Sequence, residues 1–436
     1  MKPPPRACLL AAVAATLLAQ QPADPTERLA KARALLVARA SRLPDYTCVQ
    51  TVDRQYFTHL HPQTPHTQPT CATITAENQR KGHNPTLAST DRLRLDVKVS
   101  HGNEIGTWAG ASQFGSRSVF DLIGGGPYGT GMLGTLIGDT FENGGATYQY
   151  LGEDTTNGTR LAAYSFQVPV DSSHYRVKAC FCDTPSASPG RDWTTTPFSG
   201  VFWLDPDTLE LRRLTVQASH LSPETGICEA VTTIDYQKVP VGTGEFLLPR
   251  QSVIRVVSRD ANESQSTAVY SGCREYLGEA AIRFDDAPAE ELAKEKLPAI
   301  PVTAAPLPAG ISFSLALTSP IDTDTAAAGD IVTAKLRKPI GTSDEVLAPA
   351  GAMVQGRIVQ MQHTLRWPRH FTIAIRLEKL EVGGVSRPLY AIGDAPAWKS
   401  PLVAAFEFRT SRSHYVVPVG DESNWVTVAP PPEERK

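Results

Sequence analysis

Apolar and charged residues alternate without a break along residues 91–99, DRLRLDVKV. Alternation with a period of two is typical of a β-strand that buries one face and leaves the other in water. The apolar residues on the face predicted to be buried are Leu93, Leu95, Val97 and Val99. The turn-forming residues 101–103 follow, so the pattern predicts an antiparallel hairpin into residues 104–108.

Strand-like segments rich in branched and aromatic residues dominate the chain up to residue 277. Turn residues at Asn157-Gly158 and at Asp205-Pro206 join neighbouring segments into hairpins. No helical pattern of about ten residues lies between the later strands, which argues against parallel βαβ units and favours an antiparallel meander. The segments are 46–57, 147–153, 161–170, 201–218, 229–239, 250–259 and 264–277.

An amphipathic helix is predicted before the first strand. Asp24 can cap it, Pro25 fits its first turn, and Glu27 completes a capping box. Pro44 ends the pattern, and residues 58–88 are predicted to form a polar, proline-rich loop. The apolar positions at helical spacing are Leu29, Ala32, Leu36, Ala40 and Leu43.

The chain is therefore predicted to be mostly β, of the α+β class, with two globular domains. Composition shifts to Ala, Pro, Glu and Lys after residue 285, which is typical of a linker. Strand-like segments then resume and predict a second, small β-barrel or sandwich. The predicted boundaries are 1–19 for a signal peptide, 24–285 and 308–428 for the domains, 286–307 for the linker and 429–436 for a disordered tail.

The first residues predict export. Lys2 and Arg6 precede an apolar run at residues 7–19, which is shorter than the ~20 residues of a membrane-spanning helix. This pattern indicates a cleaved Sec-type signal peptide. It predicts a periplasmic or secreted protein with no transmembrane segment in the mature chain. The formal net charge of −3 argues against a nucleic-acid partner.

Six cysteines follow the predicted signal peptide. An even number in an exported chain indicates disulfides, and six cysteines allow 15 pairings. The favoured bridges are Cys48–Cys71, which would close a loop, and Cys228–Cys273, on strands predicted to be neighbours. Cys180 and Cys182 are then left without an assigned partner, and reduced, buried thiols are the alternative for the whole set.

A glycine-rich segment, GGGPYGTGMLGTLIGD at residues 124–139, contains the spacing G-x-G-x-x-G. A dinucleotide clamp would need a helix after the third glycine, and only three residues separate Gly134 from Gly138. We therefore predict no cofactor. The apolar residues of the segment favour a piece of chain that folds across a sheet face, either as core packing or as a movable lid over an apolar cavity.

Signatures of hydrolases are absent, including G-x-S-x-G and H-E-x-x-H. His174 is the best isolated catalytic candidate, but a single histidine in a strand is more often a surface residue. The sequence therefore predicts a protein that is not an enzyme, with a secreted hydrolase as the alternative, because triads assemble from distant positions.

Two segments contain metal-ligating residue types. HLHPQTPH at residues 59–66 could offer imidazoles, but a solvated loop is favoured. IDTDTAAAGD at residues 321–330 resembles a calcium loop, yet it lacks the central glycine and the final glutamate. Aspartates that cap turns are the better explanation, and no metal site is predicted.

Two hairpins carry a resemblance to a family. VFWLDPDTLELRRL at residues 201–214 resembles the strand–Asp-Pro–strand signature of the LolA-like superfamily of outer-membrane lipoprotein carriers and sigma-E regulators. IDYQKVPVGTGEFLLP at residues 234–249 resembles the same group. The resemblance covers residues 24–285. It implies an antiparallel half-open β-barrel wrapped over helices, which binds acyl chains or senses envelope stress.

The C-terminal residues resemble a different family, the β-barrel domain of TrbI-like conjugation core proteins. The shared points are Pro308-Ala309-Gly310, Gly329-Asp330 and Pro349-Ala350-Gly351. In that family the domain mediates envelope assembly, which implies a protein-interaction module here.

Together these patterns predict an exported envelope protein that binds an apolar ligand, such as a lipid or a lipoprotein acyl chain. A non-enzymatic scaffold or stress sensor with an envelope protein partner is the alternative. The predicted ligand-binding residues, which ordinary core packing would equally explain, are Leu93, Leu95, Val97, Trp108, Phe166 and Phe202.

Overall fold

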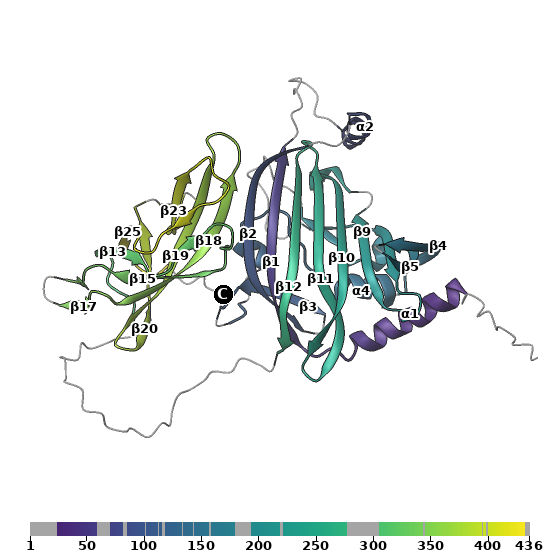
Figure 1. The fold of residues 1–436 in the computed structure, drawn as a ribbon, viewed down its shortest axis with the longest axis horizontal. Helices are drawn as coiled ribbons and strands as arrows, with labels where there is room; N and C mark the ends of the chain where they lie inside the picture. Colours follow the sequence, from purple (N-terminus) through teal and green to yellow (C-terminus); the bar gives the residue numbers. More distant parts are fainter. Residues whose placement is uncertain are drawn as a thin grey trace, which may run out of the picture.

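The computed structural model describes residues 24–58, 70–81, 85–178, 193–276 and 305–431, apart from single residues and pairs within these ranges. It is built mainly from antiparallel strands, as the alternation predicts (Figure 1). The signal peptide, the histidine loop, Cys180 and Cys182 lie outside the described residues. Among the described helices, none is long and apolar enough to cross a bilayer.

The N-terminal domain is one curled antiparallel sheet with two free ends. β1 lies inside it, paired with β2 on one side and with β12 on the other. The terminal strands β3 and β4 are not paired with each other, which leaves the barrel half open. The spatial order is β3 (Asn103–Trp108), β2 (Thr86–Ser100), β1 (Tyr46–Thr58), β12 (Glu263–Glu275), β11 (Gly244–Ser258), β10 (Ile227–Val241), β9 (Leu211–Ala218), β8 (Phe198–Leu204), β5 (Thr159–Val168), β4 (Thr147–Thr156).

The concave face of this sheet holds the main core, and α1 (Pro25–Ala40) covers one end of it. Asp24 caps the helix by accepting a hydrogen bond from the Thr26 amide at 3.0 Å. Ala32 and Leu36 turn into the core, where they are 0% and 5% exposed. The inward residues predicted from the alternation, Leu93, Leu95, Val97 and Val99, are all buried.

The C-terminal domain has its own core around Trp425. Its strands are antiparallel, and the longest are β18 (Met353–Thr364) and β19 (His370–Val382). Leu307, at the end of the predicted linker, is buried in this core. The longer strands are β13 (Ser312–Leu317), β15 (Ile331–Leu336), β18, β19, β20 (Val385–Pro388), β23 (Ser400–Arg409) and β25 (Glu422–Thr427). The shorter ones are β14 (Ile321–Asp322), β16 (Ile340–Gly341), β17 (Val346–Ala348), β21 (Ala391–Gly393), β22 (Pro396–Ala397) and β24 (Val416–Val417).

Backbone hydrogen bonds join the two domains, which the sequence did not predict. β18 pairs with the start of β2, with Gln362 opposite Asp91 (Figure 1). Further along β2, the Arg94 amide donates to the Ala328 carbonyl at 2.7 Å, and the Ala328 amide donates to the Arg92 carbonyl at 2.8 Å. Ala328, from the C-terminal domain, is thereby buried in the N-terminal core.

Two arginines reinforce this junction. Arg357 is 4% exposed, and its Nη1 donates to the carbonyls of Ala109 and Gly329 at 2.6 Å each. Arg94 pairs with Asp330 across the junction. Asp330, one of the aspartates in the predicted turn segment, therefore holds the domains together and also accepts a hydrogen bond from the Ala327 amide at 2.9 Å.

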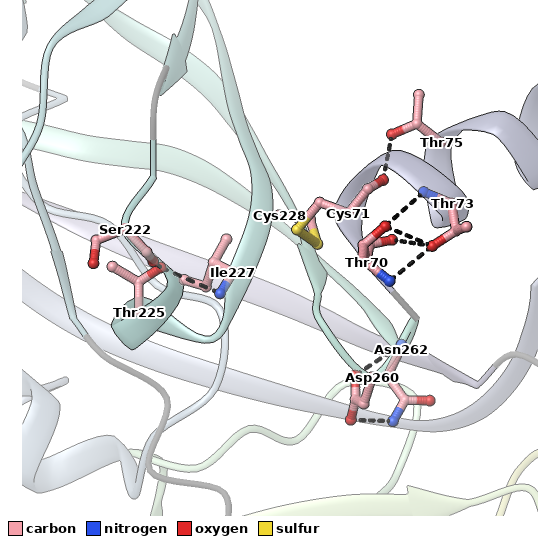
Figure 2. Close-up of a disulfide and its surroundings, with 10 residues drawn as sticks. All are labelled: Thr70, Cys71, Thr73, Thr75, Ser222, Thr225, Ile227, Cys228, Asp260 and Asn262. Atoms are coloured by element: carbon pink, nitrogen blue, oxygen red, sulfur yellow. Dashed lines mark hydrogen bonds between the residues drawn. A yellow bond between two sulfur atoms is a disulfide. The ribbon is translucent and has the colours of Figure 1, made fainter. Parts of the chain in front are cut away.

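The four cysteines predicted to be bridged are bridged, but the predicted pairings are wrong. Cys48 bonds to Cys273, because β1 and β12 are neighbours in the sheet. Cys71 bonds to Cys228 at the start of β10 (Figure 2). Cys228 and Cys273 cannot lie on neighbouring strands, since β11 separates β10 from β12.

The loop predicted at residues 58–88 is also corrected, because part of it is the helix α2 (Cys71–Lys81). Thr70 and Thr73 cap each other at its start, the Thr73 amide donating to Thr70 Oγ1 at 3.2 Å and the Thr70 amide to Thr73 Oγ1 at 2.7 Å (Figure 2). Ile74 anchors the helix against Val257 and Ala261. A single apolar anchor and a disulfide give no periodic signal, so the helix is hard to predict.

Gly329→Ala tests the junction against a matched control. Gly329 has φ +112°, and a Cβ there would lie 2.0 Å from the Arg94 carbonyl oxygen. Gly310 has φ +90°, and a Cβ there would meet nothing within 4 Å. Both substitutions carry backbone strain of about 1–3 kcal/mol. For Gly329→Ala we expect the free energy of unfolding to fall further, by about 1 kcal/mol for each junction hydrogen bond that breaks.

The measurement is the free energy of unfolding from urea titrations of Gly329→Ala and Gly310→Ala. Equal losses in the two variants would contradict the close approach at the junction.

Candidate functional site

A single segment, residues 118–142, crosses the concave face of the N-terminal sheet; we call it the strap. It contains α3 (Val119–Ile123), α4 (Thr135–Ile137) and a π-helical turn at Gly138–Glu142. Ser118 Oγ caps α3 by accepting from the Phe120 amide at 3.3 Å, and Gly124 ends it with φ +69°. The three-residue helix after Gly134 cannot form a dinucleotide clamp.

An arginine buried in β1 fixes the glycine-rich part of the strap. Arg54 is 4% exposed and forms a bidentate pair with Asp91, at 2.6 and 2.7 Å. Its remaining Nη1 donates to the Gly125 carbonyl. Gly126 must lack a side chain, because a Cβ there would lie 2.3 Å from the Tyr56 hydroxyl and 2.7 Å from Arg54 Nη1. The glycines thus allow the strap to lie directly on the sheet.

The far end of the strap is fixed by α1 and by the opposite part of the sheet. Arg33 of α1 donates from Nε and Nη2 to the Phe141 carbonyl at 3.0 and 2.8 Å. The Phe141 ring packs edge-on against Phe202 of β8, with 4.9 Å between centroids. The strap therefore spans from β1 to β8 and is held at both ends.

Between these anchors the strap touches the sheet at Tyr128, which donates to Gln50, and a cavity of about 1460 Å³ remains beside it. This volume exceeds the ~300–1,000 Å³ of most small-molecule pockets. One wall is the strap, with Val119, Met132 and Leu136. The opposite wall is formed by β10 and β11, with Ala230 and Ile254. Polar residues such as Thr135 of the strap and Thr232 of β10 also line these walls, so the cavity suits a guest with both apolar and polar parts.

Aromatic rings border the cavity where the strap meets the small hairpin of β6 (Arg176–Lys178) and β7 (Trp193–Thr195). Phe120 lies 4.9 Å from Trp193 and 5.7 Å from Tyr128, centroid to centroid. The Arg176 guanidinium lies 5.8 Å above the Trp193 ring. Trp193 remains 36% exposed, so this edge presents an apolar ring and a cation together to solvent.

A polar cluster lies at another part of the cavity, where Glu104 and Tyr128 contribute to the lining. The Tyr128 hydroxyl donates to Gln50 Oε1 at 2.8 Å, and Gln50 Nε2 donates to the Tyr270 hydroxyl at 3.1 Å. Among the described residues, the buried hydroxyls of Tyr46 and Tyr236 have no hydrogen-bond partner.

Burial raises the pKa of these tyrosines, and the Glu104 charge adds to the effect. This applies to Tyr46, Tyr128, Tyr236 and Tyr270. All four hydroxyls therefore stay protonated at neutral pH and remain able to donate a hydrogen bond.

His174, the catalytic candidate predicted from the sequence, lies at the cavity beside a buried carboxylate. Asp139 is 1% exposed, and its two oxygens contact the His174 amide and Nδ1 at 2.7 Å each. No sequence pattern indicates Asp139, which lies in the π-helical turn at the end of the strap. A histidine and a carboxylate are two parts of a hydrolytic triad. In the described part of the chain, no serine, threonine or cysteine is hydrogen-bonded to the His174 ring.

The six residues predicted to bind ligand lie in the packed core, and none is among those that line the cavity. Their ligand-binding role stays a prediction. The predicted site residues do not include the apolar lining. Residues 124–139 are predicted to form core packing or a lid over an apolar cavity. On β10 and β11, alternation indicates burial without indicating empty space. The six residues are Leu93, Leu95, Val97, Trp108, Phe166 and Phe202.

The acidic segment of the C-terminal domain gathers three possible metal ligands. Donor atoms of Asp322, Asp324 and His414 lie within 4.8 Å of one another. These groups are already engaged, since Asp322 Oδ1 faces His414 Nε2 at 2.9 Å and accepts from the Asp324 amide at 2.9 Å. Asp322 thus caps its turn, as the sequence predicts.

No protein-family model matches the chain, and no curated protein matches it. Solved structures do. A Vibrio parahaemolyticus structure, described as an outer membrane lipoprotein-sorting protein domain, is 12% identical with a TM-score of 0.28. The matched region covers 57% of this chain and 92% of the Vibrio parahaemolyticus chain. A LolA superfamily protein from Nitrosomonas europaea is 10% identical with a TM-score of 0.25, covering 56% of this chain and 93% of its own.

The lipoprotein LppX of Mycobacterium tuberculosis is also similar, at 10% identity and a TM-score of 0.20, covering 59% of this chain and 100% of its own. The Nitrosomonas europaea protein carries the name of the superfamily that the hairpins at residues 201–214 and 234–249 resemble. The resemblance of the C-terminal residues to TrbI-like proteins stays a prediction.

The raised tyrosine pKa values predict how stability depends on pH. Because folding raises these pKa values above the ordinary value of about 10, ionisation favours the unfolded chain. The stability due to the neutral hydroxyls is complete below about pH 10 and falls as the pH rises towards the folded-state pKa values. We expect Tyr236→Phe, which removes a buried hydroxyl without a partner, to be more resistant to alkaline unfolding than the wild type.

The measurement is the unfolding midpoint in urea as a function of pH, followed together with tyrosinate absorbance. If Tyr236→Phe and the wild type lost stability in parallel above about pH 10, the hydroxyl of Tyr236 would not be buried as described.

Proposed function

We propose that this protein is an exported envelope carrier or binding protein that holds a lipid or a lipoprotein acyl chain between the strap and β10–β11. The observation that supports this is the cavity of about 1460 Å³ with apolar residues on both walls. Transfer of a long alkyl chain from water into such a space gains about 0.8 kcal/mol for each buried CH₂ group.

The polar cluster gives the guest an orientation. The alkyl chain lies along Met132, Leu136 and Ile254, while a hydroxyl-bearing end group faces Tyr128 and Glu104. The Tyr128 hydroxyl gives its proton to Gln50, so its oxygen and the Glu104 carboxylate both accept a hydrogen bond from a guest hydroxyl. A ligand with one long apolar part and one uncharged polar end therefore fits better than a free fatty carboxylate beside Glu104.

Ala230→Phe tests the proposal by filling the cavity from β10. Ala230 is 4% exposed and lines the cavity, so a phenyl ring there would compete with the guest. The control is Val269→Phe, which adds a ring at a position of β12 that is 44% exposed and does not line the cavity. We expect Ala230→Phe to weaken binding of a fluorescent monoacylglycerol about tenfold or more, because the ring displaces about two CH₂ groups of the guest, at about 0.8 kcal/mol each.

The measurement is a fluorescence titration of the wild type and both variants, with thermal unfolding to confirm that each folds. Equal affinities for the wild type and Ala230→Phe would place the ligand elsewhere. A wild type that takes up no lipid analogue would contradict the carrier proposal and favour the alternative of a scaffold with a protein partner.

A further inference from the structure

The most exposed large apolar side chain of the described residues is Trp367, which is 92% exposed at the tip between β18 and β19. Tryptophan is highly buried on average in folded proteins. At this tip it is flanked by Arg366 and Arg369, which are also exposed. The next loop, after β23, adds the exposed Arg409 and Arg412. We call these five residues the Trp367 tip.

The two loops lie side by side. His370, at the start of β19, pairs with Arg409, and the Thr410 amide donates to the Arg369 carbonyl at 3.2 Å. Residues 346–377 and residues 408–420 contain no aspartate or glutamate. Among the described residues, none of the four arginines of the tip forms an ion pair with a carboxylate. The tip therefore carries four positive charges outside ion pairs on a chain with a formal net charge of −3, and Asp322 and Asp324 lie beside its second loop, at His414.

The tip lies at one end of the cavity-bearing sheet. Arg366 donates to Thr58 Oγ1 at the end of β1, and the Leu365 amide donates to the Ala88 carbonyl of β2 at 2.9 Å. Tyr56, two residues before Thr58, lines the cavity. Ser264 lines it too, and β12 begins at this end of the sheet, since Glu263 pairs with Phe57.

We propose that the Trp367 tip docks this protein on the surface of an anionic lipid bilayer. Tryptophan concentrates at the interface between lipid headgroups and acyl chains, because its ring is apolar and its N–H is polar. Arginines near an anionic surface are attracted to lipid phosphates, each strengthening binding about fivefold. Docking by this tip brings the Tyr56 end of the cavity towards the bilayer. The proposal does not depend on the cavity holding a lipid.

The test is co-sedimentation of the full chain with vesicles of phosphatidylethanolamine and phosphatidylglycerol, against vesicles of phosphatidylcholine alone. We expect the wild type to bind the anionic vesicles at low salt and to bind the neutral ones much less. Trp367→Ser should weaken binding at least tenfold. The double substitution Arg366→Gln with Arg369→Gln should weaken it about 25-fold, at about fivefold for each arginine.

Two control variants remove an exposed apolar side chain and an exposed arginine outside the Trp367 tip. Val419→Ser removes an apolar side chain that is 59% exposed, and Arg250→Gln removes an arginine whose side chain is 58% exposed. Both should bind like the wild type. Brominated acyl chains should quench tryptophan fluorescence of the wild type and leave that of Trp367→Ser unchanged.

Because Trp367 is almost fully exposed, its substitution should leave the unfolding midpoint unaltered, and this is measured alongside. Binding of Trp367→Ser equal to that of the wild type would overturn the proposal. So would equal binding to anionic and neutral vesicles, or no binding to either, which would point to a protein at the tip instead of a membrane.

Discussion

An open antiparallel sheet with an apolar concave face must be covered, because exposed apolar surface of this extent is costly in water. Here α1 covers one end and the strap covers the rest. The strap is fixed at the two places where a buried arginine or an aromatic ring holds it, at Arg54 and at Phe141. Between them the cover does not fill the space, and the cavity of about 1460 Å³ is the consequence.

The need to cover exposed parts of the sheet also explains why the C-terminal domain packs against the N-terminal domain. β2 is long enough to pair with β1 and β3 and still offer backbone groups to residues near Ala328 and to β18. Unpaired backbone N–H and C=O groups of a strand can pair with another chain, and the C-terminal domain covers these groups of β2. Because the junction is made of backbone bonds and the buried Arg357, the domain also holds its exposed loops in a fixed place beside the sheet.

Local patterns predicted local structure well. The alternation at residues 91–99 identified a buried face, Asp24 identified a helix start, and Asp205-Pro206 identified a hairpin tip. The disulfide pairings were predicted wrongly because they depend on contacts between residues that are distant in the sequence. Cys48 meets Cys273 only because β1 and β12 are neighbours, at a sequence separation of 225. Alternation likewise shows which side chains point inward but not whether the space they face is filled. The predicted ligand residues and Met132 and Ile254 of the cavity lining belong to the same buried cluster, and only the latter border empty space.

The most direct measurement is photocrosslinking with a monoacylglycerol that carries a photoreactive group in its acyl chain, followed by mass spectrometric mapping of the labelled peptides. We expect label on the strap around Met132 and on β11 around Ile254, which both line the cavity. Label confined to the convex face of the sheet, or no label at all, would contradict the central claim that the space beneath the strap receives an apolar guest.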